Sequence, residues 1–231
     1  MAPASSFLIS GIFFLSDGSR STNPPYYAQY LSALDFLNPD QFIDVSIRKY
    51  TPPSEPLYAE ETVVFLVAKA ALPAGEEGML DVIHCTPFQS SWENFKGSLP
   101  LGATHTASIT GTIGAVSNVG ATRSFVINAS EYVRDERRGF TIRHVFPCLY
   151  WLSSILIGSN LRFQFEADSG RWKNLRLPPT GSTVIATGAF KDIADDGHGE
   201  PILTLLDMSF GVSEAVVASP TRTIGHRRAG K

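Results

Sequence analysis

The sequence predicts an all-β fold of small closed or partly open β-barrels, one or two in tandem, with short helices. Short runs of β-branched and aromatic residues alternate with Gly, Pro and Asp/Asn clusters, which is typical of strands joined by turns. Several runs contain an internal glycine, and a small sheet needs such bends to close on itself. The 231 residues are 43% hydrophobic and 18% charged, enough for one large or two small globular domains.

The C-terminal part contains the clearest strand pattern. Gly111, Gly114 and Gly188 lie inside predicted strands and mark expected bends. The order predicts a barrel of about five strands over residues 99–215, with an apolar helix at 146–157 between the third and fourth. The expected strands are 107–118, 122–133, 140–146, 160–168, 182–190 and 201–210.

The N-terminal part resembles the C-terminal part in plan. Residues 60–88 and residues 181–210 both read as an apolar strand, an acidic glycine-bearing loop and an apolar strand ending in Phe. Residues 7–19 resemble residues 108–120, with Gly11 matching Gly111. These likenesses predict a degenerate barrel over 1–98, although β-hairpins also resemble one another generically.

Two further segments complete the expected organisation. In residues 24–38, Tyr27, Tyr30, Leu31 and Leu34 follow helical spacing after two prolines, which predicts a helix near 26–37. Residues 216–231 are expected to form a flexible basic tail.

Two motifs resemble the OB-fold, the oligonucleotide/oligosaccharide-binding barrel. "ITGTIGAV" (109–116) is similar to its curved first strand, and "LPPTGSTVIATGAF" (177–190) resembles its fourth strand, with a G-x-x-V-x-x-x-G pattern. The resemblance covers residues 100–212 and implies a non-enzymatic protein that binds single-stranded DNA or RNA. In such proteins aromatic rings stack on bases and Arg or Lys side chains contact phosphates.

Charge distribution places the expected binding surface in the middle of the chain. The net charge is -3, yet residues 120–176 hold nine Lys/Arg against five Asp/Glu. In residues 161–166, alternation puts Leu161, Phe163 and Phe165 in the core and the intervening side chains outside. Trp172 stands between two cations, where stacking and packing are equally expected. The candidate nucleic-acid-binding residues are Arg123, Tyr132, Arg134, Arg162, Gln164, Arg171, Trp172, Lys173 and Arg176.

An alternative function is a protein-interaction or assembly module without nucleic-acid binding, in which the chain contacts itself or another protein. Net acidity and high apolar content favour this alternative. The acidic loop at 191–200 would also repel phosphates if it bordered the binding surface.

Motifs for catalysis and membrane insertion are missing from the sequence. It has no nucleophile elbow, P-loop, H-E-x-x-H or C-x-x-C pattern, and no cofactor is expected. His84, Cys85, His144 and Cys148 could meet as zinc ligands, but buried thiols and structural histidines explain them better. The sequence has two cysteines, no long apolar run and no positively charged segment before the first apolar run. These features predict a nuclear or cytoplasmic protein without a membrane partner.

Overall fold

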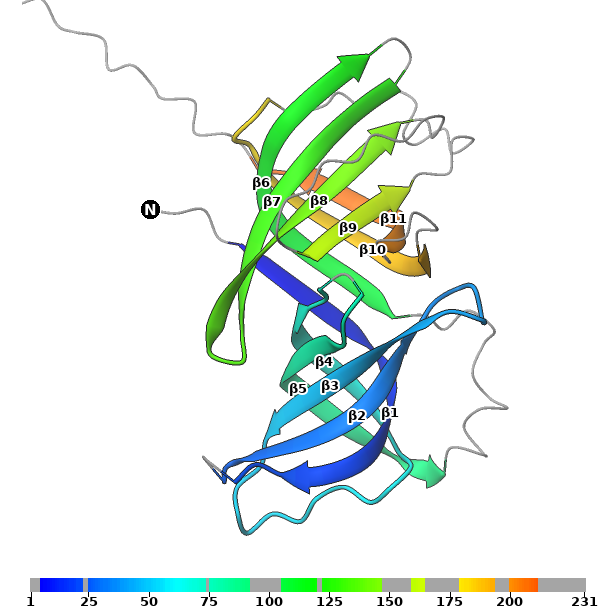
Figure 1. The fold of residues 1–231 in the computed structure, drawn as a ribbon, viewed down its shortest axis with the longest axis vertical. Helices are drawn as coiled ribbons and strands as arrows, with labels where there is room; N and C mark the ends of the chain where they lie inside the picture. The colour runs from blue at the N-terminus through cyan, green and yellow to red at the C-terminus, as the bar shows by residue number, and fades with distance from the viewer. Residues whose placement is uncertain are drawn as a thin grey trace, which may run out of the picture.

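The computed structural model describes residues 5–22, 25–73, 75–91, 105–119, 122–146, 159–164, 179–193 and 200–211. Every regular element in these ranges is a β-strand, so the predicted all-β class is confirmed (Figure 1). Within them, no helix is long and apolar enough to cross a membrane. The strands are β1 (Ser6–Arg20), β2 (Tyr27–Asp35), β3 (Phe42–Tyr50), β4 (Thr62–Ala71), β5 (Gly78–Ser91), β6 (Thr106–Val119), β7 (Thr122–Val133), β8 (Glu136–Phe146), β9 (Ser159–Gln164), β10 (Thr183–Ile193) and β11 (Pro201–Phe210).

The first five strands close into a ring, in the order β1-β2-β3-β5-β4 and back to β1. All neighbours are antiparallel except β3 and β5, which run parallel. A five-stranded ring with this crossover is the arrangement of an OB-type Greek-key barrel. We call it the first ring.

The remaining strands close into a second ring, in the order β6-β7-β8-β9-β11-β10 and back to β6. Strand β9 is parallel to both β8 and β11 and separates them. Apart from β9, the order repeats that of the first ring, and the hairpins compared in the sequence, β4–β5 and β10–β11, occupy matching places. Its six described strands correspond to the six strands expected from the sequence, one more than in the expected barrel of about five. The expected helix at 146–157 falls outside the described residues beyond Phe146.

The helix predicted near 26–37 is wrong, because this segment forms β2. Its side chains alternate, with Ala28, Tyr30 and Leu34 buried in the ring and Leu31 exposed. Tyr30 and Leu34 fit both a helical and an alternating pattern. Pairing with β1 and β3 satisfies the backbone groups on both edges, and this tertiary constraint decides for the strand.

Glycines lie where the strands bend, as the sequence predicts. The β6–β7 register shifts between Ile113 and Val116, around Gly114, and the β10–β11 register shifts at Gly188. A Cβ on Gly188 would lie 2.6 Å from the Phe163 ring and 2.9 Å from the Thr204 carbonyl oxygen. Close backbone approach thus requires glycine at this bend.

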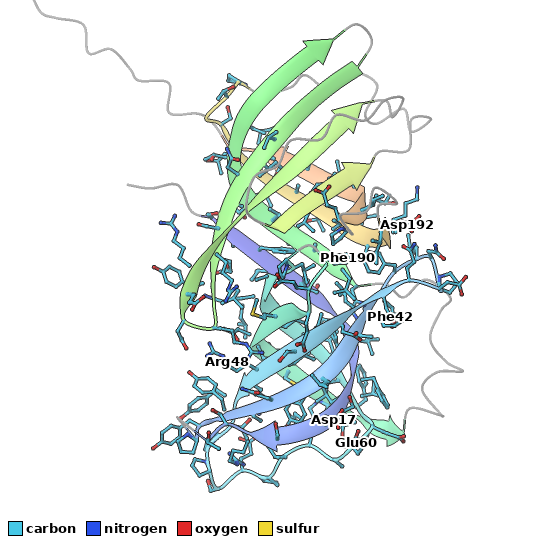
Figure 2. The ribbon with its side chains drawn as sticks, in the orientation of Figure 1. Asp17, Phe42, Arg48, Glu60, Phe190 and Asp192 are labelled. Atoms are coloured by element: carbon cyan, nitrogen blue, oxygen red, sulfur yellow. The ribbon has the colours of Figure 1, made fainter. Side chains whose placement is uncertain are left out.

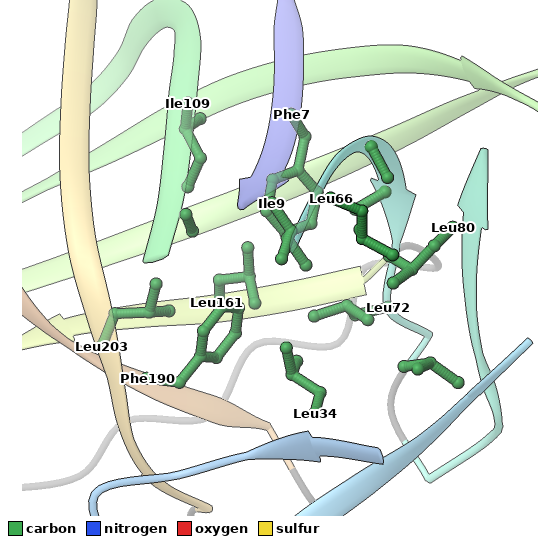
Figure 3. Close-up of a cluster of buried hydrophobic side chains, with 14 of the residues drawn as sticks. Phe7, Ile9, Leu34, Leu66, Leu72, Leu80, Ile109, Leu161, Phe190 and Leu203 are labelled. Atoms are coloured by element: carbon green, nitrogen blue, oxygen red, sulfur yellow. The ribbon is translucent and has the colours of Figure 1, made fainter. Parts of the chain in front are cut away.

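Strand β1 belongs to the first ring and joins it to the second. Residues Ser6–Ser10 pair with β6, while Leu8–Leu15 pair with β4 on the opposite edge. Figure 1 shows β1 running from the second ring into the first. The buried apolar side chains form one cluster across this junction, in which Phe7 and Ile9 lie between Leu66 of the first ring and Ile109 of the second (Figure 3).

Two further contacts fasten the rings. The loop between β2 and β3 pairs with β10, since the Leu37 amide donates to the Phe190 carbonyl at 3.0 Å and Asn38 to the Lys191 carbonyl at 3.1 Å. Buried His105 packs against Phe13, with ring centroids 4.3 Å apart. Its Nδ1 lies 3.2 Å from the Asp35 carbonyl oxygen and its Nε2 lies 2.8 Å from the Ile12 carbonyl oxygen.

We expect Gly188→Ala to destabilise the protein by about 1–3 kcal/mol, because the added methyl group overpacks the bend. Gly139→Ala is the matched control in β8, since its Cβ would meet nothing within 4 Å. The control should be neutral or slightly stabilising. Chemical denaturation measures both free energies of unfolding, and equal values would contradict the role assigned to Gly188.

We expect stability to fall as the pH drops below about 6.5, with His105 contributing. Burial lowers the pKa of His105 from its usual 6.5. The hydrogen bonds to the backbone carbonyls of Asp35 and Ile12 and the charge of Asp35 raise the pKa, but they oppose the effect of burial only in part. The unfolded chain therefore binds the His105 proton more readily than the folded chain, so acid favours unfolding. Denaturation measures the free energy of unfolding at about pH 7.5 and about pH 5.5. Its decrease between the two pH values should be smaller in His105→Gln than in the unmodified chain. Identical pH dependence in the two proteins would refute this contribution.

Candidate nucleic-acid interface

Three tyrosines form an aromatic surface at one end of β2 and β3. We call Tyr26, Tyr27 and Tyr50 the tyrosine platform. Tyr26 and Tyr50 are 48% and 59% exposed, and their rings stack with centroids 6.4 Å apart and an 18° angle between planes. Tyr27 meets Tyr50 edge-on at 5.9 Å. The platform thus presents two nearly parallel aromatic rings to solvent.

Strand alternation places the platform on the outer face of the first ring. Tyr27 and Tyr50 are directly paired across β2 and β3, followed by Gln29 opposite Arg48. Because side chains on one strand face alternate sides, residues two apart share the outer face. In OB-type barrels the face of strands 2 and 3 is the ligand-binding surface.

Arg48 links the platform to the neighbouring strands. Its guanidinium lies 4.7 Å from the centroid of the Tyr27 ring, within cation–π distance. Nε and Nη2 donate to the two carboxylate oxygens of Asp81 at 2.8 and 2.7 Å, and Nη1 donates to Asp135 at 2.8 Å. Burial alone would lower the pKa of Arg48, but the hydrogen bonds and charges of Asp81 and Asp135 raise it.

Arg20 fixes the backbone on which the platform is built. Its guanidinium donates to the carbonyl oxygens of Thr51 at 2.9 Å, Pro52 at 3.2 Å and Glu55 at 2.6 Å. The Thr51 amide in turn donates to the Tyr26 carbonyl at 2.7 Å. Because Arg20 also donates to the Pro25 carbonyl oxygen at 3.5 Å, it holds together the two chain segments that carry Tyr26 and Tyr50.

The segment after β3 packs beneath the platform. Lys49 pairs with Glu55 at 2.9 Å, and its ammonium lies 5.3 Å from the centroid of the Tyr58 ring. Burial raises the pKa of Tyr58 and of Cys85. Both groups therefore stay protonated at neutral pH, and Cys85 lacks the thiolate character of a reactive cysteine.

The turn of the β7–β8 hairpin borders the platform on its β5 side. Arg134 and Asp135 both adopt positive φ, of 57° and 66°. The Arg134 amide donates to Asp81 at 2.7 Å, and its Nη2 donates to the Ser46 hydroxyl at 2.7 Å. Figure 2 shows Arg48 below the hairpin end, with Phe42 at the far end of the same strand. Second-ring residues thus complete one edge of the first-ring surface.

The structure describes the side chains of two of the nine residues predicted to bind nucleic acid, Tyr132 and Arg134. Tyr132 is 58% exposed and lies opposite Arg137, whose Nε donates to the Ser130 hydroxyl at 3.2 Å. Arg134 Nη2 donates to the Ser46 hydroxyl, and its role as a nucleic-acid contact stays a prediction. For Arg123, Arg162 and Gln164 only the backbone is described, in β7 and β9, while Arg171, Trp172, Lys173 and Arg176 lie outside the described residues.

The structure also describes part of the predicted core at 161–166 and two of the possible zinc ligands. Leu161 and Phe163 are buried, as alternation predicts, while Phe165 falls outside the described residues. His84 is exposed and lies 2.9 Å from the Thr86 hydroxyl oxygen, and Cys85 is a free thiol. The described ranges contain no group of three potential metal ligands.

The tyrosine platform was not predicted from the sequence. The helical reading of residues 24–38 put Tyr27 and Tyr30 on one face, whereas in β2 Tyr30 points into the core and Tyr27 outward. The available signal was the alternation in "FIDVSIRKY" (42–50), which places Arg48 and Tyr50 together on one side of a strand.

The acidic loop that argued against phosphate binding starts at the opposite end of this face. Asp192 accepts a hydrogen bond from Asn38 at 3.4 Å, beside the start of β3 (Figure 2). Tyr50 ends the nine-residue β3, about 25 Å along the strand from its start. Repulsion from Asp192 is therefore largely screened at the platform at physiological salt.

We expect Arg20→Ala to lower the free energy of unfolding by about 1–3 kcal/mol, because four carbonyl oxygens lose a charged donor. Arg137→Ala removes an exposed arginine that has one side-chain partner among the described residues, and it should change stability by less than about 0.5 kcal/mol. Urea denaturation compares the two variants. A loss for Arg20→Ala no larger than that for Arg137→Ala would contradict the anchoring role.

Comparisons with known proteins assign no family. No protein-family model matches the sequence, and no curated protein matches it. The solved structures that are similar at a low level include the following two. The crystal structure of the tetrameric p202 HIN2 is 7% identical, with a TM-score of 0.23 over 90% of this chain and 97% of that one. The p204 HINb domain is 8% identical, with a TM-score of 0.22 over 87% and 96%. Likeness this small assigns neither fold nor function.

Proposed function

We propose that this protein binds single-stranded nucleic acid without catalysing a reaction, and that the tyrosine platform is its principal contact surface. The observation that carries the proposal is the pair of exposed, stacked rings of Tyr26 and Tyr50 on the β2–β3 face. Every nucleobase has a flat π-face, so such rings bind single strands with little sequence preference. In a duplex the bases are paired and stacked on one another, so their faces are not available to the tyrosine platform.

The charges around the platform suit a few phosphate contacts rather than many. Arg20, Arg48 and Lys49 lie at this end of the first ring, but Arg48 and Lys49 are paired with carboxylates. Each phosphate neutralised on a single strand adds about 0.7 to the slope of log affinity against log salt. We therefore expect weak binding with a shallow slope, dominated by stacking.

The second ring supplies further proposed contacts. Tyr132 and Arg137 are opposite each other and exposed, close in sequence to the turn that borders the platform. Arg123, Arg162, Gln164, Arg171, Trp172, Lys173 and Arg176 stay predictions as nucleic-acid contacts.

A second candidate function is protein interaction or self-assembly. The observation that favours it is the set of large apolar side chains exposed on the described surface. Leu31 and Phe42 belong to the β2–β3 face, whereas Phe65 and Ile83 lie on β4 and β5. Size-exclusion chromatography at increasing protein concentration tests this function independently of any oligonucleotide.

We expect Tyr50→Ala to weaken binding of a labelled oligothymidylate by about 1–3 kcal/mol, with little change in stability, because the lost ring stacks on a base. Tyr26→Ala should behave in the same way. Phe65→Ala is the control, since it removes an exposed ring from β4, away from the β2–β3 face. Fluorescence anisotropy at low salt measures the affinities.

Two outcomes would contradict the proposal. One is the absence of oligothymidylate binding by the unmodified protein at low salt. The other is an equal loss of affinity in Tyr50→Ala and Phe65→Ala, which would show that binding does not depend on the platform. Assembly that is lost in Leu31→Ala or Phe42→Ala, without oligonucleotide binding, would favour the second candidate function.

A further inference from the structure

We propose that Asp135 occupies the phosphate position of the tyrosine platform, and that a bound single strand displaces its carboxylate from Arg48. This inference rests on the proposed function and adds to it a specific anion site with a built-in competitor. The site consists of Arg48 Nη1 beside the Tyr27 ring, and its present occupant is a carboxylate of the β7–β8 turn.

The geometry of Arg48 leaves one side of the guanidinium for an exchangeable anion. Asp81 takes Nε and Nη2 in a two-point contact, and both side chains are largely buried, at 14% and 15% exposure. Such paired contacts are the strong ones, so this half of the guanidinium is committed. Nη1 is the donor that faces the exposed carboxylate of Asp135.

Asp135 is a weakly held occupant. Its side chain is 80% exposed, and its contact with Arg48 is an ion pair whose acidic end is in water. Exposed ion pairs contribute little to stability, because water solvates the released carboxylate. The hydrogen bond from Arg48 and its charge lower the pKa of Asp135, so the carboxylate is ionised at neutral pH and competes with a phosphate there.

Loss of the Asp135 contact would leave the hairpin in place. Arg134 fastens the turn through Ser46 and Asp81, and Glu131 of β7 pairs with Lys69 of β4 at 3.2 Å. Displacement of Asp135 therefore requires movement of one side chain on a turn that other contacts position. The platform and the hairpin can stay together while the anion at Arg48 is exchanged.

The test compares Asp135→Asn with Glu136→Gln. Both remove one negative charge from the same turn, but the Glu136 carboxylate pairs with Arg138 at 2.8 Å instead of Arg48. Asparagine tolerates the positive φ of position 135, and Asp135→Gly provides a second variant that does so. We expect Asp135→Asn to bind a labelled oligothymidylate about two- to fivefold more tightly than Glu136→Gln.

A second arm uses inorganic pyrophosphate, which lacks bases, and follows the Arg48 Nε–H resonance by NMR. Pyrophosphate should shift this resonance at lower concentration in Asp135→Asn than in Glu136→Gln. If the unmodified protein binds oligothymidylate but the two variants bind it equally, the displacement is refuted and the proposed function stands. If no protein binds oligothymidylate, the proposed function fails, and a pyrophosphate difference would still support the anion site. Equal or absent pyrophosphate responses would then refute the site as well.

Discussion

The two-ring architecture depends on β1, which forms hydrogen bonds with strands of both rings. Its first residues pair with β6, its middle with β4 and its last residues with β2, so one strand closes the first ring and extends the sheet into the second. Removing β1 would open the first ring and expose the edge of β6 that faces it. The continuous apolar cluster follows from this sharing, because Phe7 and Ile9 are inserted between the two interiors. The junction also leaves no room for a side chain at Gly11, because a Cβ there would collide with the buried His105.

The candidate interface depends on contacts that come from distant parts of the chain. Arg20 at the end of β1 positions the segments around Tyr26 and Tyr50, while Arg48 stacks on Tyr27 and binds Asp81 of β5. The β7–β8 turn then adds Asp135 from the second ring. These contacts leave the rings of Tyr26 and Tyr50 exposed. A rigid, exposed aromatic surface loses little conformational entropy when a ligand binds, which favours stacking.

Local electrostatics at the platform differ from those of the whole chain. The net charge of -3 argues against general attraction to phosphates. The cations near the tyrosines are held by carboxylates and carbonyl oxygens, so a phosphate would have to replace an existing partner. Binding at such a site would owe more to the aromatic faces than to charge, and overall acidity does not prevent it.

The sequence by itself determined the β class, the glycine bends at Gly114 and Gly188, and the burial of Leu161 and Phe163. These features can be predicted locally, because alternation acts within a few residues and a glycine inside a strand marks a bend. The contacts that exclude a Cβ at Gly188 are nevertheless made by β9 and β11. Only the tertiary structure decided that residues 27–35 form a strand, that β9 separates β8 from β11, and that Arg134 turns toward Ser46. The tyrosine platform belongs to this second group. Its rings and cations come from β1, β2, β3 and the turns after them, and pairing partners far away in the chain set which side of each strand faces solvent.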